Sequence, residues 1–197
     1  QYTSKDDIVL IVEPVLMAPL RKEWAAIQEE ARTLAQKRDA APDRRTKNAV
    51  QANLEKLIFD FARKLATIRI LDPACGSGNF LYVALRLLLD LWKEIAIFAA
   101  EMKMTMLAPI SGQAPSPEQL YGIEINEYAH ELAQATVWIG YLQWLHDNGY
   151  GTPGEPILKP LDTIKQMDAI LAYDEQGNPV EPEWPEVEII VGNPPFL

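Results

Sequence analysis

A glycine-rich turn is the first segment of the sequence whose residue types could do chemistry. The stretch ILDPACGSGNF at 70–80 places an acidic residue after an apolar run and puts Gly76 and Gly78 ahead of a helical pattern. Glycines let a backbone approach a ligand closely, and the N–H groups that open the next helix can bind an anionic group. A tight strand-to-helix connection would use the same glycines, so this turn alone is weak evidence for a ligand site.

A second acidic residue ends another apolar run. In YGIE at 121–124, Glu124 stands where a carboxylate could accept hydrogen bonds from two ribose hydroxyls. The ends of parallel strands meet at one edge of a sheet, so we expect both segments to share one site. A nicotinamide dinucleotide and S-adenosylmethionine both fit this arrangement. Leu81 replaces the third glycine of GxGxxG, which favours S-adenosylmethionine.

A proline-stiffened loop follows the last apolar run. In VGNPPFL at 191–197, the side-chain oxygen of Asn193 and the carbonyl of Pro194 could accept the hydrogens of a planar amino group. Phe196 offers a flat face for stacking on the ring that carries that group. The alternative is a proline-ended strand with an aromatic plug, which the glycine-rich turn upstream disfavours.

The elements that must position these loops divide into two regions. Residues 1–66 predict a helical segment that packs on the core, with a helix beginning at Lys5 and others near 20–37 and 48–65. Pro14 and Pro19 should kink or break the first of these helices. Residues 67–197 predict an α/β core with a mostly parallel sheet. Its expected strands are 68–71, 119–124, 166–171 and 187–191, its helices 80–106 and 127–146, and its long loops 148–160 and 173–186.

Charge is distributed unevenly over a chain whose net charge is −10. Residues 1–69 hold 13 Lys and Arg against 10 Asp and Glu, whereas residues 70–197 hold 5 against 18. A self-sufficient nucleic-acid binder is disfavoured because Lys and Arg supply most phosphate contacts. With the chain ending just after Phe196, we expect further regions to supply a basic surface.

Cysteine content and hydropathy indicate the cellular compartment of the protein. Cys75 is the single cysteine and cannot form an internal disulfide, and no charged leader or long uncharged apolar stretch is present. We therefore expect a cytoplasmic protein without a membrane partner. His130 and His146 lack neighbours at metal-ligand spacing, so we expect no metal site. The run at 135–145 is apolar nearly all round, which predicts core packing, with a homodimer through exposed apolar surface as the alternative.

Three motifs together resemble a known family. DPACGSGNF, GIEIN and NPPF are similar to signature motifs of amino-group DNA methyltransferases in the order of the gamma class, and YTS at 2–4 and MDAIL at 167–171 resemble two further motifs. The nearest group is the large single-chain type IIL restriction-modification enzymes. The resemblance implies a Rossmann-like S-adenosylmethionine-dependent methyltransferase core that methylates adenine N6. Truncated after NPPF, the chain would by itself be inactive and would meet double-stranded DNA through regions outside it.

The resemblance also implies roles for individual residues. The cofactor would be held by Thr3, Asp72, Pro73, Ala74, Cys75, Gly76, Gly78, Glu124, Ile125 and Asp168. The flipped target base would be held by the catalytic loop Asn193, Pro194, Pro195 and Phe196. Three other methyl acceptors remain as alternatives, namely cytosine N4, an RNA base and a glutamine amide. A further alternative is a module that binds the cofactor without turnover.

Overall fold

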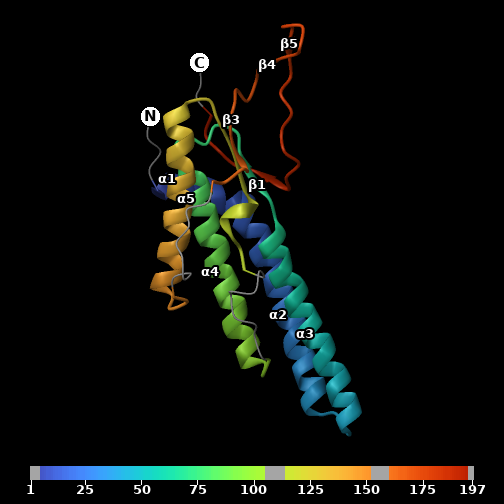
Figure 1. Ribbon diagram of the computed structural model, residues 1–197. Helices are drawn as coiled ribbons and strands as arrows, with labels where there is room; N and C mark the ends of the chain where they lie inside the picture. The colour runs from blue at the N-terminus through green and yellow to red at the C-terminus, as the bar shows by residue number, and fades with distance from the viewer. Residues whose placement is uncertain (1–4, 105–113, 152–159, 195–197) are drawn as a thin grey trace. The chain divides into compact units, whose positions relative to one another are not determined.

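The computed structural model describes residues 5–104, 114–151 and 160–194, and the chain forms two compact units (Figure 1). The first unit contains residues 1–15, 68–87 and 116–197, and the second contains residues 16–67 and 88–115. The long helix α4, Asn79–Glu101, contributes to both.

A four-stranded parallel sheet forms the centre of the first unit. Its strands are β1 (Ile70–Asp72), β2 (Leu120–Glu124), β3 (Ile164–Gln166) and β6 (Ile189–Ile190), in the order β3-β2-β1-β6. Asp72 lies opposite Gly122, and Glu124 lies opposite Gln166. Ile70, Leu71, Leu120 and Ile123 are buried, as expected for the inner strands of a parallel sheet. The predicted α/β fold class is confirmed.

The third strand lies earlier than predicted. Residues 164–166 form β3, whereas most of the predicted strand 166–171 turns away from the sheet. The cause is Asp168, whose Oδ1 accepts the N–H groups of Ile170 at 2.8 Å and Leu171 at 3.2 Å. A side chain that binds its own following backbone competes with strand pairing. The last strand is also shorter than the predicted 187–191.

A small hairpin occupies the segment predicted as a loop at 173–186. Strands β4 (Ala172–Tyr173) and β5 (Pro179–Val180) pair antiparallel and form a separate two-stranded sheet. The Asp174 side chain accepts the N–H groups of Gln176 and Asn178, and Gly177 has a φ of +81°. Turn chemistry of this kind stabilises short hairpins.

Helix α5, Glu127–Asp147, packs on β2 and β3 of the first unit. Asn126 caps this helix, because its Oδ1 accepts the N–H of Ala129 at 2.9 Å. Its apolar run is buried on one side, at Val137 and Trp144, whereas Ile139 is 57% exposed. The core packing predicted for this run therefore holds on one side of the helix only. Shorter elements of this unit are α1 (Lys5–Val12) and a 3₁₀ turn, η3 (Pro117–Gln119).

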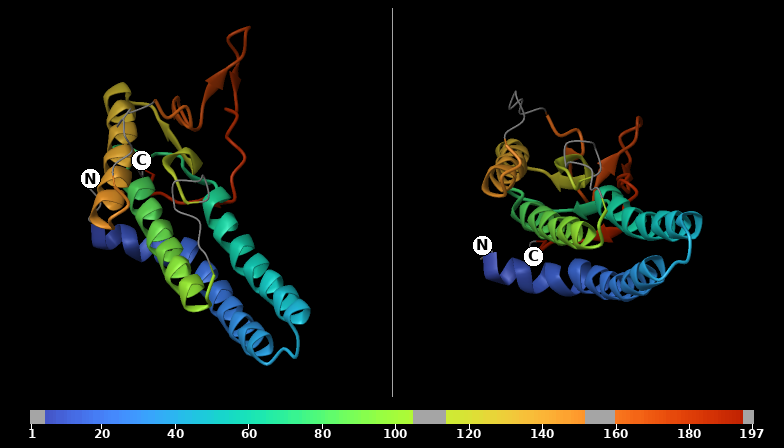
Figure 2. Two further views of the ribbon diagram at one scale, coloured as in Figure 1. Left: turned by 60° about the horizontal axis from the view of Figure 1, so that its bottom comes forward. Right: turned by 90° about the horizontal axis from the view of Figure 1, so that it is seen from below.

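The second unit is built on an antiparallel helical hairpin of α2 (Ala18–Asp39) and α3 (Arg44–Thr67), which run side by side (Figure 2). Trp24 stacks on Phe61 at 5.5 Å and meets the edge of Phe98 from α4 at 5.3 Å. Aromatic contacts of this geometry add to the stability from burial. Both helices were predicted, and each extends two to four residues beyond its predicted ends.

Pro14 changes the helix type rather than breaking the helix. A π-helical segment, η1 (Glu13–Met17), joins α1 to α2 where a kink or a break was expected. The wider π turn relieves the clash that a proline ring makes with the preceding turn. Helix α4 also ends earlier than the predicted Met106, at Glu101. No helix within the described ranges is long and apolar enough to cross a membrane.

Candidate active site at the carboxyl ends of the strands

The two predicted acidic residues end neighbouring strands of the first unit. Asp72 is the last residue of β1 and Glu124 the last residue of β2, and these strands are paired. Parallel strands present their carboxyl ends at one edge, which is where open α/β sheets bind ligands. The sequence therefore predicted correctly that these segments share one edge.

The glycine-rich turn between β1 and α4 is bonded directly to the end of β2. The N–H of Cys75 donates to the carbonyl of Ile123 at 3.0 Å, and the N–H of Gly76 donates to Glu124 Oε2 at 2.8 Å. Gly76 and Gly78 have φ values of +52° and +79°, which favour glycine. A Cβ on Gly78 would lie 3.0 Å from the Cα of Ala133, so α5 packs against the turn itself.

Glu124 uses both carboxylate oxygens in backbone contacts. Oε2 accepts the N–H of Gly76, and Oε1 accepts the N–H of Asn126 at 2.8 Å. A carboxylate has about four acceptor positions, so each oxygen retains capacity for one more donor. The carboxylate is thus fixed in orientation and still able to bind a pair of hydroxyls.

Asp72 is the most deeply buried carboxylate among the described residues, with 1% of its surface exposed. Burial, aided by the negative charge of Glu124 and opposed by a hydrogen bond from the Ala74 N–H at 3.1 Å, raises the pKa of Asp72 to about 7. A cationic group bound beside Asp72 would favour its ionised form.

The loop after β6 passes close to Asp72. The N–H of Val191 donates to the carbonyl of Leu71 at 2.9 Å, and a Cβ added to Gly192 would lie 2.5 Å from Asp72 Oδ1. Only glycine fits this approach. Asn193 and Pro194 come next and are exposed. Pro195, Phe196 and the N-terminal Thr3 lie outside the described residues.

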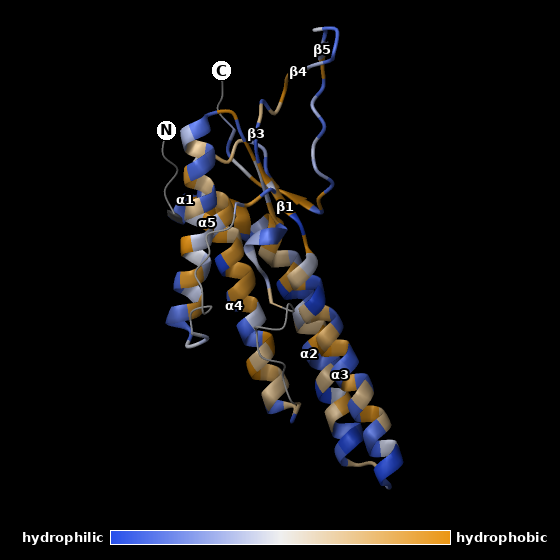
Figure 3. Ribbon diagram, viewed as in Figure 1, coloured by the Kyte–Doolittle hydropathy of each residue, from blue (hydrophilic) through white to orange (hydrophobic). Residues whose placement is uncertain are grey.

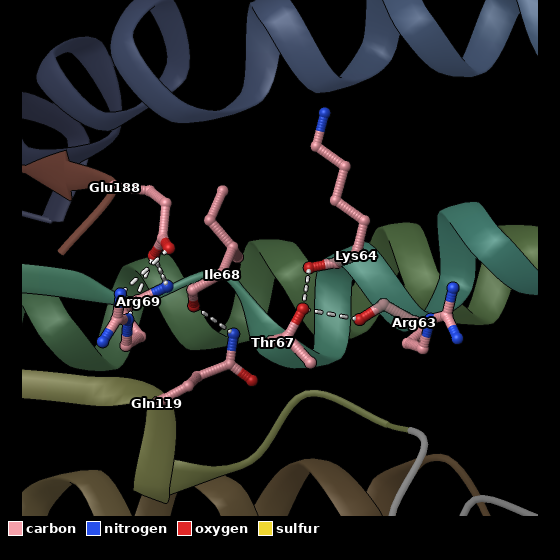
Figure 4. Close-up of polar contacts among 7 residues, drawn as sticks. All are labelled: Arg63, Lys64, Thr67, Ile68, Arg69, Gln119 and Glu188. Atoms are coloured by element: carbon pink, nitrogen blue, oxygen red, sulfur yellow. Dashed lines mark hydrogen bonds and ion pairs between the residues drawn. The ribbon is translucent and has the colours of Figure 1, made fainter.

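An ion pair that the sequence did not predict anchors β6 beside β1 (Figure 4). Glu188 Oε2 accepts the backbone N–H of Arg69 at 2.7 Å, and Arg69 Nη2 lies 3.3 Å from Glu188 Oε1. On the other side, Gln119 Nε2 donates to the carbonyl of Ile68 at 2.8 Å. These contacts fix the residues just before β1 to the segments that enter β6 and β2.

The remaining predicted cofactor residues surround this edge in different ways. Pro73 and Ala74 lead into the turn and are half-buried, and Ile125 is 66% exposed. Asp168 follows β3 and is half-buried, and the neighbouring Met167 N–H donates to the carbonyl of Glu124 at 3.1 Å. The structure thus brings 72–78, 124–125 and 167–168 to one edge of the sheet.

The side chain of Cys75 is buried, like that of Asp72. Burial raises the pKa of Cys75 to about 12, and the charges of Asp72 and Glu124 act in the same direction. The sulfur also explains why residue 122 is a glycine, because a Cβ there would lie 2.9 Å from Cys75 Sγ. The thiol is protonated at neutral pH, which makes it a packing group rather than a nucleophile.

Comparison with known proteins gives this geometry a family. A family model described as the MmeI DNA-methyltransferase domain matches residues 45–197. The chain is similar to DNA methyltransferase A of Bacillus subtilis strain 168, at 27% identity over 100% of the chain and 20% of that protein. It is also 37% identical, over 47% of the chain and 8% of the relative, to a putative type II restriction enzyme and methyltransferase of Methanocaldococcus jannaschii.

A solved structure shares the fold. The type IIL restriction-modification enzyme MmeI, solved in complex with DNA, aligns with a TM-score of 0.62 at 23% identity, over 85% of the chain and 20% of that protein. The chain thus spans a fifth or less of the length of these relatives. The resemblance to type IIL enzymes is confirmed. Since the matching family model covers residues 45–197 of 197, the chain belongs to the family of MmeI DNA-methyltransferase domains.

Proposed function

We propose that this chain is the cofactor-binding and catalytic-loop part of a restriction-modification enzyme that transfers a methyl group from S-adenosylmethionine to adenine N6 in double-stranded DNA. The observation that carries the proposal is the bonded edge formed by Asp72, the turn at Gly76 and Glu124. Family membership supplies the reaction class, and this edge supplies groups that match the proposed cofactor.

Each part of S-adenosylmethionine has a matching group at this edge. Glu124, held by two backbone N–H groups, would accept the ribose hydroxyls, and exposed Ile125 would pack on the adenine ring. Asp72 would pair with positive charge on the methionine part, and a Cβ at Gly76 would meet nothing within 4 Å, which leaves room for the ligand beside the turn. Asp168 would accept from the exocyclic amino group. By the family resemblance, Thr3 would close over the cofactor.

The catalytic loop would act by positioning the target amino group. S-adenosylmethionine supplies a methyl group activated by its sulfonium centre. Asn193 and the carbonyl of Pro194 would accept the two N6 hydrogens, drawing the nitrogen lone pair toward the methyl group. Phe196 would stack on the flipped base, and Pro195 would stiffen the loop. Direct transfer is favoured over a covalent route because the thiol of Cys75 has a pKa of about 12.

The excess of acidic residues in 70–197 limits how well this part of the chain can bind DNA. With 5 Lys and Arg against 18 Asp and Glu, this part of the chain is poorly suited to hold DNA alone. We therefore assign most DNA contacts, and the choice of recognition sequence, to other regions of the full-length protein. We also propose a cytoplasmic location, since that is where the protein would meet its DNA substrate.

The decisive experiment offers labelled methyl donor to the full-length protein with DNA, RNA and protein acceptors. We expect label in duplex DNA and recovery of N6-methyladenine after digestion. Recovery of N4-methylcytosine would keep the fold and cofactor roles while changing the target base. Label confined to RNA or protein, or no transfer by a protein that binds the donor, would overturn the proposal.

A further inference from the structure

Beyond the strand edge, the exposed cations at the loop end of the second unit form a separate surface feature. We define the basic tip as Lys37, Arg44, Arg45, Lys47 and Lys103, all of them exposed. Figure 3 shows the loop end of the α2–α3 hairpin as hydrophilic, where these helices meet. In a chain with a net charge of −10, such a cluster is unusual and requires an explanation.

The carboxylates near the basic tip are committed to contacts of their own. Asp39 accepts a hydrogen bond from Arg38 Nε at 2.9 Å, and this bond, followed by the charges of Arg38, Lys103 and Lys47, lowers its pKa. Asp43 Oδ1 accepts the N–H of Thr46 at 2.9 Å and its Oδ2 accepts the Thr46 hydroxyl at 2.8 Å, so Asp43 caps α3.

Cationic side chains outnumber carboxylates around the tip. Lys37, Arg38, Arg44, Arg45, Lys47 and Lys103 stand against Asp39, Asp43 and Glu101. Within the described ranges, Lys103 approaches Asp39 at 4.0 Å, and no ion pair involves Arg44, Arg45 or Lys47.

Two features of the basic tip are unfavourable for local stability. Arg44, Arg45 and Lys47 lie in the first turn of α3, where the helix dipole favours anions over cations. Lys103 has a φ of +62° in the turn that ends α4, where Lys103 N–H donates to Ala100 and Met104 N–H to Ala99. Glycine is the favoured residue at this position of such a turn. Local rules are broken most often where function requires it.

The tip is also rigidly held. Arg38 is 4% exposed, and its Nη1 donates to Gln51 Oε1 at 2.9 Å and to the carbonyl of Met102 at 2.6 Å. This one side chain joins the ends of α2 and α4 to α3. The exposed cations therefore extend from a fixed base, so less ordering is needed when they bind a partner.

We propose that the basic tip is a docking site for the phosphate backbone of duplex DNA, which positions the protein on DNA without reading its sequence. The inference rests on the proposed function, since it assumes that the substrate is DNA. Exposed Lys and Arg in excess over carboxylates match the regular negative charge of a duplex, and such contacts set register and affinity. An acidic protein is the competing partner for the same charges.

The test removes the charges from the tip of the full-length protein. R44Q/R45Q/K47Q is compared with K22Q/K56Q/R63Q, which removes three exposed cations from the sides of the same hairpin and changes the net charge equally. Duplex affinity is measured against salt concentration. For the tip variant we expect duplex affinity to fall about tenfold at low salt. Its salt slope should decrease by about 1 for each cation removed. The control variant should bind nearly as the unmodified protein does.

Methyl transfer kinetics separate this inference from the proposed function. At saturating DNA the tip variant should keep its kcat, with a raised KM for DNA. Unchanged affinity and salt slope in a tip variant whose parent methylates DNA would overturn the inference alone, and would favour an acidic protein as the partner. Equal losses in the tip and control variants would also overturn it. A parent that methylates no DNA would overturn the proposed function first.

Discussion

The carboxylate of Glu124 accepts the backbone N–H of Gly76 at 2.8 Å, across 48 residues of sequence. Together with the bond from the Cys75 N–H to the Ile123 carbonyl, this bond joins the turn that follows β1 to the end of β2. A side chain proposed to bind the ribose thus also fixes the glycine-rich turn. Cofactor affinity and turn geometry should therefore change together when Glu124 is altered.

Replacement of Glu124 by Gln or Ala should weaken cofactor binding by about 1–3 kcal/mol, the usual cost of leaving partner groups unpaired. Gln retains one oxygen and cannot serve both backbone N–H groups as acceptor. Calorimetry with S-adenosylmethionine or S-adenosylhomocysteine measures the effect. Glu127→Gln, in the exposed first turn of α5, is the matched control. Equal affinity of both variants and the parent would remove the ribose assignment.

Asp72→Asn should stabilise the fold at neutral pH while weakening cofactor binding. With a pKa of 3.8 in the unfolded chain and about 7 in the folded protein, Asp72 makes the folded state lose stability as pH rises from about 4 to 7. Asn keeps the oxygen that accepts from Ala74 and has no charge to bury. We expect a gain of roughly 2–4 kcal/mol at pH 8 that vanishes below pH 4. Urea unfolding from pH 4 to 8, with exposed Asp162→Asn as control, checks this.

Gly192→Ala should reduce stability by about 1–3 kcal/mol and impair methyl transfer, because its Cβ would lie 2.5 Å from Asp72 Oδ1. A double-mutant cycle tests the cause. In an Asp72→Ala background the clashing atoms are gone, so most of the destabilisation should disappear. A cost that is the same in both backgrounds would show that some other contact limits this position.

Lys103→Gly should raise the free energy of unfolding by about 0.5–1 kcal/mol, since glycine adopts a φ of +62° without strain. Lys103→Ala removes the same charge and keeps the strain, so it should give no gain. Both variants should lose about one unit of the DNA salt slope. Thermal unfolding and salt-dependent DNA binding together distinguish the backbone effect from the charge effect.

Asn193→Ala in the full-length protein should abolish most methyl transfer and leave cofactor affinity nearly unchanged. The reason is that Asn193 is proposed to act on the target amino group in the transition state rather than on the cofactor. Parallel measurements of turnover and cofactor affinity check the separation. Near-normal turnover would remove the catalytic role of this loop.

The sequence predicted the glycine-rich turn and its relation to Glu124 because both depend on local signals. Gly76 and Gly78 mark a turn, and the apolar runs before Asp72 and Glu124 mark buried strands. The third strand was misplaced since the Asp168 side chain binds its own backbone, and a hydropathy pattern does not reveal that competition. The hairpin at 172–180 was missed because each strand has two residues, too few for a periodic signal.

Contacts between distant residues could not be predicted. Arg69 and Glu188 are separated by 119 residues, and either could equally have been an exposed charge. The close approach of Gly192 to Asp72 depends on which strand lies beside β1, which a single sequence does not specify. The left-handed conformation of Lys103 was not predicted either, because lysine does not indicate a turn of this kind.

The sheet order has a consequence for how the protein folds. β1 lies between β2 and β6, yet Ile189 pairs with Ile70 only after the intervening chain has been made and has folded back. During synthesis β1 therefore has one open edge until residues 189–190 emerge, and closing so long a loop slows this pairing. The exposed edge of β1 is then open to pairing with other chains. Among the four strands described, β6, which leads into the proposed catalytic loop, should thus be the last to assemble.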